Sequence, residues 1–301
     1  MPRSEPAGAA TAALVAGLLA RCDLPPPGTP VTCAVSGGAD SLALLVLATE
    51  AGCRATAVHV DHGLRPGSAA EAEVVAAAAA ARGAGFRAER VEVAPGPNLE
   101  ARARVARYAA LGPGALTGHT ADDLAETVLL NLVRGAGLDG LAGFDPSRRP
   151  LRRLRRAETA ALCVAVGLDP VRDPSNEDPA FRRNRVRHEL LPLLDAIAER
   201  DVVPLLARQA ELARADRSLL DELAAGLDPT DARALAAAPL PLARRAVRRW
   251  LRTGPERHPP SSAEVERVLA VARGEAVACE LGGGRRVVRS AQRLRVASDH
   301  G

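Results

Sequence analysis

Residues 36–41, Ser-Gly-Gly-Ala-Asp-Ser, constrain the fold of this chain more than any other stretch. They lie between the apolar runs 31–35 and 42–48. A β-rich run, a glycine turn and a helical run form an arrangement that cradles phosphate, because glycines let the backbone approach the ligand and the amides at a helix start point at the anion. The loop lacks the Gly-Lys-Ser/Thr ending of a P-loop and carries Asp40 instead. A carboxylate there is explained if Mg²⁺ lies between it and the phosphates. The predicted nucleotide-binding residues are Ser36, Gly37, Gly38, Ala39, Asp40 and Ser41.

The first half of the chain alternates strand-like and helical runs. Strand-like runs fall at 31–35, 55–60, 88–93 and 115–118, and helical runs at about 41–51, 68–83, 98–111 and 122–134. This alternation is typical of a parallel sheet with helices on both faces, whose ligands bind beyond the carboxyl ends of the strands. We therefore expect an α/β domain with its site at that edge of the sheet.

A second polar motif, residues 59–65, follows the second strand and contains His59, Asp61 and His62. Two histidines and an aspartate fit a metal site, an exposed turn or a wall of the nucleotide pocket. The position beside the glycine loop favours the pocket wall, so His59 is a predicted nucleotide-binding residue.

A third motif, Gly-His-Thr-Ala-Asp-Asp-Leu-Ala-Glu-Thr at 118–127, follows the fourth strand. Thr120 can cap the next helix with Asp123 at its third position. Capping does not account for His119 or for two adjacent acids at one strand end. His119 and Asp123 are four residues apart and can face one cleft, which predicts metal binding or proton transfer.

A fourth motif places four arginines within six residues after an acidic turn at 173–178. They are Arg182, Arg183, Arg185 and Arg187. A solvated helix face and a grip on phosphate or RNA explain this pattern equally well on chemistry alone.

Charge is unevenly spread over the 301 residues, a length that suits two domains. Residues 1–143 hold 11 Arg and 14 acidic residues, a net charge of −3, and residues 144–301 hold 29 Arg and 22 acidic residues, a net charge of +7. This asymmetry suggests a catalytic domain followed by a polyanion-binding region. All 40 basic residues are Arg, which excludes Schiff-base, P-loop and kinase lysines.

The compartment is inferred from the cysteines and the apolar runs. The five cysteines are scattered and none has Cys-x-x-Cys spacing, which suits a reducing cytoplasm and gives no support to zinc or iron–sulfur sites. The apolar run 9–20 is typical of an amphipathic first helix, and no run reaches the roughly 18 apolar residues of a membrane span. We predict a cytoplasmic protein with no membrane partner.

The four motifs, in this order, resemble the tRNA(Ile)-lysidine synthetase family of N-type ATP pyrophosphatases, whose phosphate loop reads Ser-Gly-Gly-x-Asp-Ser. The resemblance covers about residues 28–195 and includes the run 100–108, which contains Arg104. Arg152 departs from the family's usual second leucine at the domain junction. The resemblance implies a Rossmann-like (adenine nucleotide alpha hydrolase-like) catalytic domain over 1–200. The sequence pattern itself places the domain boundary near residue 200, since it is mainly helical from about residue 190 and indicates a short β-hairpin at 279–296. The resemblance is weaker there and implies that this smaller domain, 201–301, binds tRNA.

The resemblance also implies an ATP-dependent reaction in two steps. ATP adenylates the C2 oxygen of the wobble cytidine in a CAU-anticodon tRNA(Ile) and pyrophosphate leaves. The amine of free L-lysine then attacks C2 and expels AMP. The product, lysidine, pairs with A, so the tRNA changes from methionine to isoleucine identity. The assembly is left open, with a homodimer as one alternative.

Roles for individual residues follow from the resemblance. The loop amides would hold phosphates and Asp40 would hold Mg²⁺. Asp123 would either share the metal or receive the lysine ammonium, and His119 would lie near the α-phosphate. Arg187, and next Arg104, would contact phosphate or cytidine. A carboxylate would deprotonate lysine, with none favoured over the others.

Three alternatives stay open. A tRNA cytidine thiolase of the same superfamily would need cysteine pairs. A non-catalytic regulator would bind ATP and RNA but form neither AMP nor pyrophosphate. In the second domain, a basic helix face either contacts tRNA or is simply solvated; its residues are Arg244, Arg245, Arg248, Arg249 and Arg252.

Overall fold

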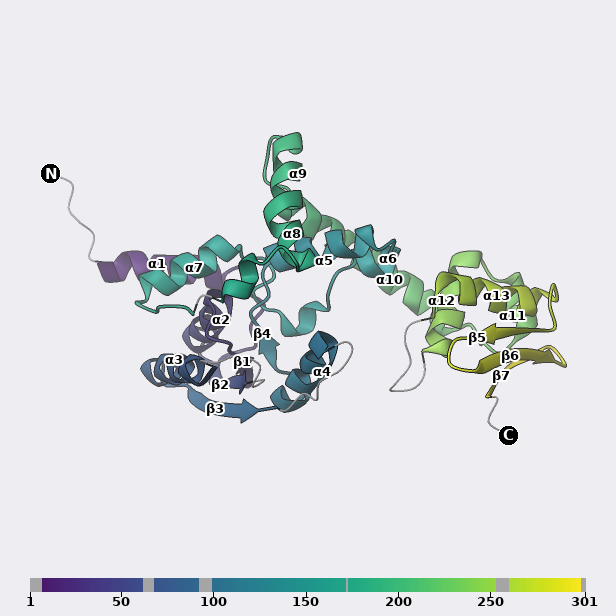
Figure 1. Ribbon diagram of the computed structural model, residues 1–301, viewed down its shortest axis with the longest axis horizontal. Coiled ribbons are helices and arrows are strands. Elements are labelled where there is room, and N and C mark those ends of the chain that lie inside the picture. The colour runs from purple at the N-terminus through teal and green to yellow at the C-terminus, as the bar shows by residue number, and fades with distance from the viewer. Residues whose placement is uncertain (1–6, 62–67, 92–98, 172, 253–259, 299–301) are drawn as a thin grey trace. The chain divides into compact units, whose positions relative to one another are not determined.

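The computed structural model describes residues 7–61, 68–91, 99–171, 173–252 and 260–298 (Figure 1). The chain forms two compact units, Met1–Glu211 and Leu212–Gly301. Helix α10 (Val203–Ala225) contains the boundary between them. Within the described residues, no helix is both long and apolar enough to cross a membrane.

A four-stranded parallel sheet forms the centre of the first unit. Its strands are β1 (Pro30–Ala34), β2 (Arg54–Asp61), β3 (Gly85–Arg90) and β4 (Leu116–Thr117), in the order β3-β2-β1-β4. The predicted parallel α/β fold is confirmed. The chain moves outward from β1 to β3 and then returns to the other side of β1. The carboxyl ends of β1 and β4 therefore flank the point where strand order reverses, which is where such sheets bind ligands.

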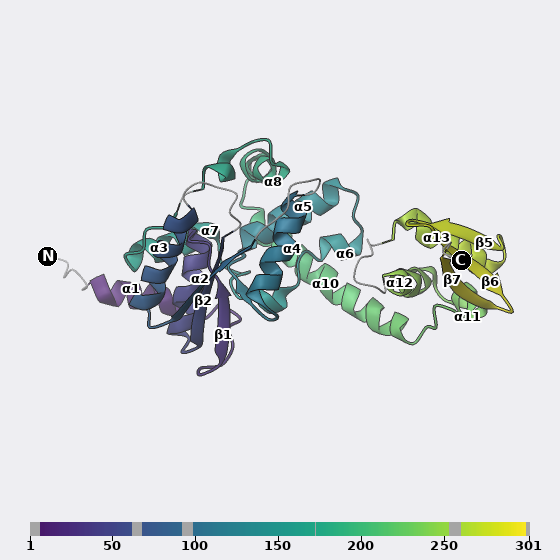
Figure 2. The same ribbon diagram turned by 60° about the horizontal axis from the view of Figure 1, so that its bottom comes forward.

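Side chains alternate across this sheet and build a core on each face. On one face Cys33, Ala55 and Ala57 join a cluster with α2 (Ala39–Glu50) and α3 (Ser68–Ala81). On the other, Ala34, Val58 and Val60 pack with Tyr108 and Leu111 of α4 (Leu99–Leu111). Figure 2 shows α2 and α3 on one side of the strands and α4 on the other. Burial is concentrated in the middle of the sheet, whereas the edge strand β3 is largely exposed and carries Arg87, Glu89 and Arg90.

Two further groups of helices complete the first unit. Helices α1 (Ala7–Leu19) and α7 (Arg156–Ala165) lie beside α2 (Figure 1). Helix α5 (Ala121–Val133) packs instead against the apolar side chains of 186–206. That segment follows α8 (Arg182–Arg185) and comprises the π-helical turn η3 (Val186–Leu190), α9 (Leu191–Ala198) and the start of α10. The short elements α6 (Leu138–Leu141), η1 (Pro146–Arg148) and η2 (Pro174–Glu177) lie in the connecting loops.

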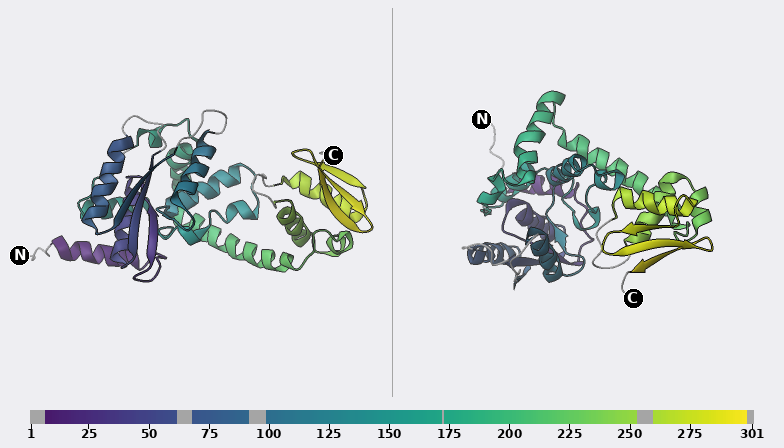
Figure 3. Two further views of the ribbon diagram at one scale, coloured as in Figure 1. Left: turned by 90° about the horizontal axis from the view of Figure 1, so that it is seen from below. Right: turned by 45° about the vertical axis from the view of Figure 1, so that its right-hand side comes forward.

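The second unit combines helices with a small antiparallel sheet (Figure 3). Its helices are the end of α10, α11 (Ala232–Ala237), α12 (Leu240–Leu251) and α13 (Ser262–Arg273). Strands β5 (Ala278–Leu281) and β6 (Arg285–Ser290) form a hairpin around glycines 282–284, and β7 (Arg293–Ser298) adds a third strand. The β6–β7 turn has positive φ at Ala291 and Gln292 (47° and 65°). Tight hairpin turns need such φ values, but neither residue type signals them in the sequence.

Many arginines of the second unit have partners inside it. On α12, Arg244 pairs with Glu266 (2.6 Å) and Arg245 with Asp221 (2.5 Å). Arg249 donates to the carbonyl of Ala224 (3.2 Å). The charges of Arg244 and Arg245 are thus paired within the unit, which reduces what this helix offers to a polyanion.

Candidate active site at the end of the parallel sheet

The glycine loop after β1 is held by its own hydrogen bonds. The Ser41 hydroxyl donates to the Gly38 carbonyl (2.8 Å) and accepts from the Ser36 amide (3.1 Å). Gly37 has φ of 88° and its carbonyl accepts from the Val171 amide (3.0 Å). A Cβ on Gly37 would lie 3.1 Å from a Val171 methyl, so glycine is required by both conformation and space. The loop is therefore preorganised for an anion at the start of α2.

Gly118, at the end of β4, lies directly against the first turn of α2. A Cβ there would lie 2.4 Å from the Asp40 carbonyl oxygen, 2.7 Å from the Asp40 carbonyl carbon and 3.0 Å from the Ser41 amide nitrogen. All three are backbone atoms, so a side chain cannot be accommodated unless the phosphate loop moves. Gly118 therefore fixes the distance between the two polar motifs.

We expect Gly118→Ala to lower kcat/KM for ATP at least tenfold, about 1.4 kcal/mol of barrier, because it displaces Asp40 and the loop amides. Steady-state ATP turnover and the Tm of the variant measure this. Gly137→Ala is the matched control, because a Cβ on Gly137 meets nothing within 4 Å. Wild-type turnover and Tm for Gly118→Ala would contradict the close approach.

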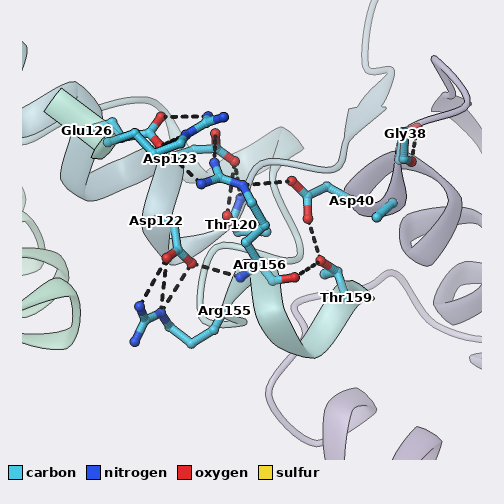
Figure 4. A network of polar contacts seen from close by, with 12 residues as sticks. Gly38, Asp40, Thr120, Asp122, Asp123, Glu126, Arg155, Arg156 and Thr159 are labelled. Carbon is cyan, nitrogen blue, oxygen red and sulfur yellow. Dashed lines mark hydrogen bonds and ion pairs between the residues drawn. The ribbon is translucent and has the colours of Figure 1, made fainter. Parts of the chain in front are cut away.

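Asp40 stands in the first turn of α2 and interacts with α7. Its carboxylate accepts a hydrogen bond from the Thr159 hydroxyl and lies 3.5 Å from Nε of Arg156 (Figure 4). Burial raises the pKa of Asp40 to about 6, against the opposing effects of the Thr159 hydrogen bond and the Arg156 charge. The free energy cost of burying this charge is therefore only partly offset by its neighbours.

Asp123 is more deeply buried and more fully paired. One carboxylate oxygen accepts from the Thr120 amide (2.8 Å) and hydroxyl (3.0 Å) at the start of α5. The other accepts from Arg156 (3.0 Å) and Arg183 (2.8 Å). Although burial raises the pKa of Asp123, the charges of Arg156 and Arg183 outweigh it and the net shift is downward. Asp123 is thus a permanent anion whose two oxygens each accept two hydrogen bonds.

Glu126, one turn further along α5, is the centre of an arginine cluster. It is fully buried, at 0% exposure. Its oxygens accept from Arg156 (3.1 Å), Arg183 (2.6 Å) and Arg187 (2.7 and 3.3 Å). Arg156 also reaches Asp40 and Asp123, so one guanidinium joins three carboxylates (Figure 4).

Asp122, the other acid of the pair, joins α5 to α7. It accepts from the Arg156 amide (2.8 Å) and from the Arg155 guanidinium (3.0–3.3 Å). These hydrogen bonds hold the start of α7 beside α5, so Asp122 stabilises the fold. The two adjacent acids in the sequence therefore have different roles.

His59 and His119 line a cavity of about 380 Å³ beside the glycine loop. Nδ1 of His119 lies 2.8 Å from the Thr117 hydroxyl, and its ring centroid lies 5.6 Å from that of Phe144. His59 is 3% exposed, and its Nδ1 lies 3.1 Å from the Val35 carbonyl. A carbonyl accepts only, so Nδ1 of His59 carries the proton.

A larger cavity of about 980 Å³ brings most of the predicted site residues together. Its walls include the phosphate loop with Asp40, and also His119, Asp123 and Arg187. Arg104 belongs to α4, but its side chain lies outside the described residues, as do His62 and Arg65. The catalytic roles of Asp40, His119, Asp123, Arg187 and Arg104 stay predictions.

The sequence pattern does not single out Glu126, Arg156 or Arg183 as individual site residues. Glu126 could have been found, because it is three residues after Asp123 on a helix and so shares its face. Arg183 and Arg187, four apart, carry the same signal. The run 149–151, followed by Arg156 and Glu158, resembles the family, but its spacing does not pair Arg156 with Glu126, since only folding brings Arg156 beside an acid 30 residues earlier in the chain.

Two protein-family models match the chain, one in each unit. Residues 19–194 match the model of the PP-loop domain, and residues 231–295 match that of the TilS substrate binding domain. The solved structure of the U34-tRNA thiolase NcsA from Methanococcus maripaludis is similar in fold, with a TM-score of 0.54. It is 18% identical and the match covers 69% of this chain and 80% of that one.

Curated relatives are much more similar in sequence. A tRNA(Ile)-lysidine synthase from Nocardia farcinica is 48% identical over 247 residues, which cover 76% of this chain and 77% of the relative. One from Rhodococcus erythropolis is 45% identical, over 76% of this chain and 75% of the relative. One from Salinispora tropica is 50% identical, over 67% of each chain.

Proposed function

Since this chain belongs to the tRNA(Ile)-lysidine synthase family, we propose that it ligates L-lysine to C2 of the wobble cytidine of a CAU-anticodon tRNA(Ile). It is an ATP-dependent ligase that modifies tRNA, and AMP and pyrophosphate are its other products. The observation that carries the proposal is one cavity lined by both the phosphate loop and the carboxylate–arginine network. A site that only bound nucleotide would not need buried acids and arginines at the same wall.

In the first step the cytidine C2 oxygen attacks the α-phosphate of ATP and pyrophosphate leaves. The backbone N–H groups of the loop and of the first turn of α2 would point at the phosphates. Their partial positive charge would stabilise the negative charge that develops on the phosphates in the transition state. His119 reaches the same cavity from β4 and is proposed to lie near the α-phosphate.

In the second step the lysine amine attacks C2 of the adenylated cytidine and AMP leaves. Asp123 is the proposed partner of a lysine ammonium, because its lowered pKa keeps it ionised; the ammonium would replace one of the guanidinium donors that now reach this carboxylate. The attacking amine must lose a proton first. A carboxylate of the cavity is the proposed base, and Asp123 suits that role poorly because its pKa is lowered.

Mg²⁺ is proposed as the counter-ion of the ATP phosphates. The donors in the loop fit this hard cation, because the Asp40 carboxylate and the serine hydroxyls are oxygen ligands. Asp123 fits less well, since each of its oxygens already accepts two hydrogen bonds. Bound there, Mg²⁺ would offset negative charge on the phosphates. Within the described residues, no three His, Cys, Asp or Glu side chains gather as a resident metal site.

The remaining partners are proposals of the same kind. The second unit would contact the tRNA, as its match to a substrate binding domain suggests. We keep the cytoplasmic location and the homodimer as predictions, the latter to be tested by analytical ultracentrifugation.

The direct test is incorporation of radiolabelled lysine into a CAU-anticodon tRNA(Ile) transcript with ATP and Mg²⁺. A transcript with wobble C changed to U is the control. ATP-dependent label in the C-containing tRNA alone would support lysidine formation. Release of AMP and pyrophosphate without label would point to a different nucleophile. Neither label nor AMP from folded protein would favour the non-catalytic regulator.

Arg187→Ala tests the arginine cluster in the same assay. We expect kcat/KM to fall at least tenfold, about 1.4 kcal/mol of barrier, because Arg187 lines the cavity. The fold should persist, since Glu126 keeps Arg156 and Arg183. Arg185→Ala is the control, because Arg185 pairs at the surface with Glu189. Unchanged kcat/KM values for ATP and tRNA in Arg187→Ala would remove Arg187 from the site.

The cysteines of this chain are poorly suited to the sulfur transfer that a tRNA thiolase would need. All five thiols are free. Burial raises the pKa of Cys33 to about 12, and it raises the pKa values of Cys22 and Cys163 to about 11. Thiols held protonated are poor nucleophiles and poor sulfur carriers.

A further inference from the structure

Three arginines surround Glu126, but they use their donors differently. Each of the three guanidinium nitrogens of Arg156 faces an acid, namely Asp40, Asp123 or Glu126. Its charge is therefore neutralised within the protein, and Arg156 acts as a bridge between α7 and α5.

Arg183 and Arg187 each use only two of their three guanidinium nitrogens in the hydrogen bonds to these acids. Arg183 bonds Glu126 through Nε and Asp123 through Nη2. Arg187 bonds Glu126 through Nε and Nη2 together. Within the described part of the chain, Nη1 of each arginine has no hydrogen-bond partner. Their side chains are 37% and 22% exposed and both line the 980 Å³ cavity.

Burial separates the charges of this cluster. Glu126 is enclosed, at 0% exposure, and Asp123 is only 8% exposed, whereas the side chains of the two arginines are more open to the cavity that they and Asp123 line. Glu126 does not line that cavity. A planar guanidinium held on one edge by a carboxylate presents its other edge in a fixed direction, and that geometry suits the oxygens of a phosphate group.

We propose that Glu126 is a positioning residue that holds Arg183 and Arg187 as a clamp for a phosphate-type anion on this cavity wall. The inference rests on the proposed function, because the anion belongs to a substrate or product of that reaction. Two sources share this chemistry: the pyrophosphate part of the nucleotide and a backbone phosphate of the tRNA. Both can be measured separately.

The experiment compares the full-length wild type with Glu126→Gln and with the double variant Arg183→Gln/Arg187→Gln. Arg185→Gln is the matched control, since Arg185 lies on α8 as Arg183 does but pairs with Glu189 outside this cavity. Calorimetry measures the affinity for pyrophosphate with Mg²⁺. A filter-binding titration at several salt concentrations measures the affinity for the tRNA transcript.

If the clamp holds pyrophosphate, both test variants lose at least about tenfold in pyrophosphate affinity and keep the salt dependence of tRNA binding. If it holds a tRNA phosphate, tRNA binding weakens and the slope of log K against log salt falls by about one for each phosphate that the protein no longer neutralises. Either result supports the clamp, provided that Arg185→Gln matches the wild type. A Glu126→Gln protein with wild-type values in both measurements overturns it.

A purely structural role for Glu126 predicts something else. Its replacement would lower the Tm and the active fraction without a selective effect on one anion. The double variant keeps the test valid if Glu126→Gln fails to fold. It retains the ion pair between Glu126 and Arg156 and changes only side chains that line the cavity. Glu126→Asp, which keeps the charge on a shorter side chain, should restore part of the lost affinity. Lysine incorporation by the wild type, measured in parallel, separates failure of the clamp from failure of the proposed function.

Discussion

Arg156→Gln is expected to destabilise the first unit by about 3–5 kcal/mol, the usual cost of breaking a buried ion pair from one side. Asp40, Asp123 and Glu126 all face this guanidinium, and Glu126 is fully buried. Glutamine cannot neutralise three carboxylates. Lysine transfer should be lost together with stability, because the same network forms a wall of the cavity.

Denaturant unfolding followed by circular dichroism measures this change. The deficit should shrink as the pH falls towards 4, because carboxylates that have lost their counter-charge become protonated more readily. Arg153→Gln is the control. Arg153 is 51% exposed, its paired acids Asp23 and Glu211 lie at 3.5 and 3.9 Å, and such surface pairs contribute about 1 kcal/mol at most. A loss below about 1 kcal/mol in Arg156→Gln would mean that the three acids do not depend on it.

Asp40→Asn should separate catalysis from folding. We expect at least a hundredfold loss of turnover, about 2.7 kcal/mol of barrier, because this carboxylate is the proposed Mg²⁺ ligand. Stability should change in the opposite direction. Burial raises the pKa of Asp40 from 3.8 to about 6, so the folded state holds the proton more tightly than the unfolded state does. Stability therefore declines as the pH rises from about 4 to about 6 and stays reduced above that range.

Removing this charge should raise the free energy of unfolding by about 1–3 kcal/mol at pH 8 and by almost nothing at pH 4. Asparagine can still accept the Thr159 hydrogen bond, and Arg156 keeps its other two acids. Asp122→Asn is the contrasting control. Although burial raises the pKa of Asp122, hydrogen bonds from Arg155 and from the Arg156 amide lower it overall, so this change should reduce stability at pH 8. Equal shifts of the same sign in both variants would contradict these assignments.

The order of elements was predictable because it depends on local pattern. Apolar runs of strand length and helical runs between them indicated the positions of β1 to β4 and of α2 to α5 to within a few residues. The third strand of the second unit was not foreseen as a separate element. Its turn uses Ala291 and Gln292 at positive φ, where a sequence normally signals with glycine or asparagine.

The sequence by itself determined the class of chemistry. A glycine loop and polar residues at successive strand ends must meet at one edge of a parallel sheet, because parallel strands all end on the same side. This common edge follows from strand direction alone, and it explains why the phosphate loop, His119 and Asp123 line one cavity.

Only the tertiary structure decided which charge meets which. Arg187 pairs with Glu126 across 61 residues, and Thr159 donates to Asp40 across 119. Spacing along the chain cannot choose among 40 arginines and 36 acids, because any of them can reach any other until packing fixes the helices. The ion pairs that join α5 to α7 and to α8 form only once the chain has folded. Folding enclosed Glu126 and left Arg183 and Arg187 at the cavity wall, together with Asp123 and Arg156.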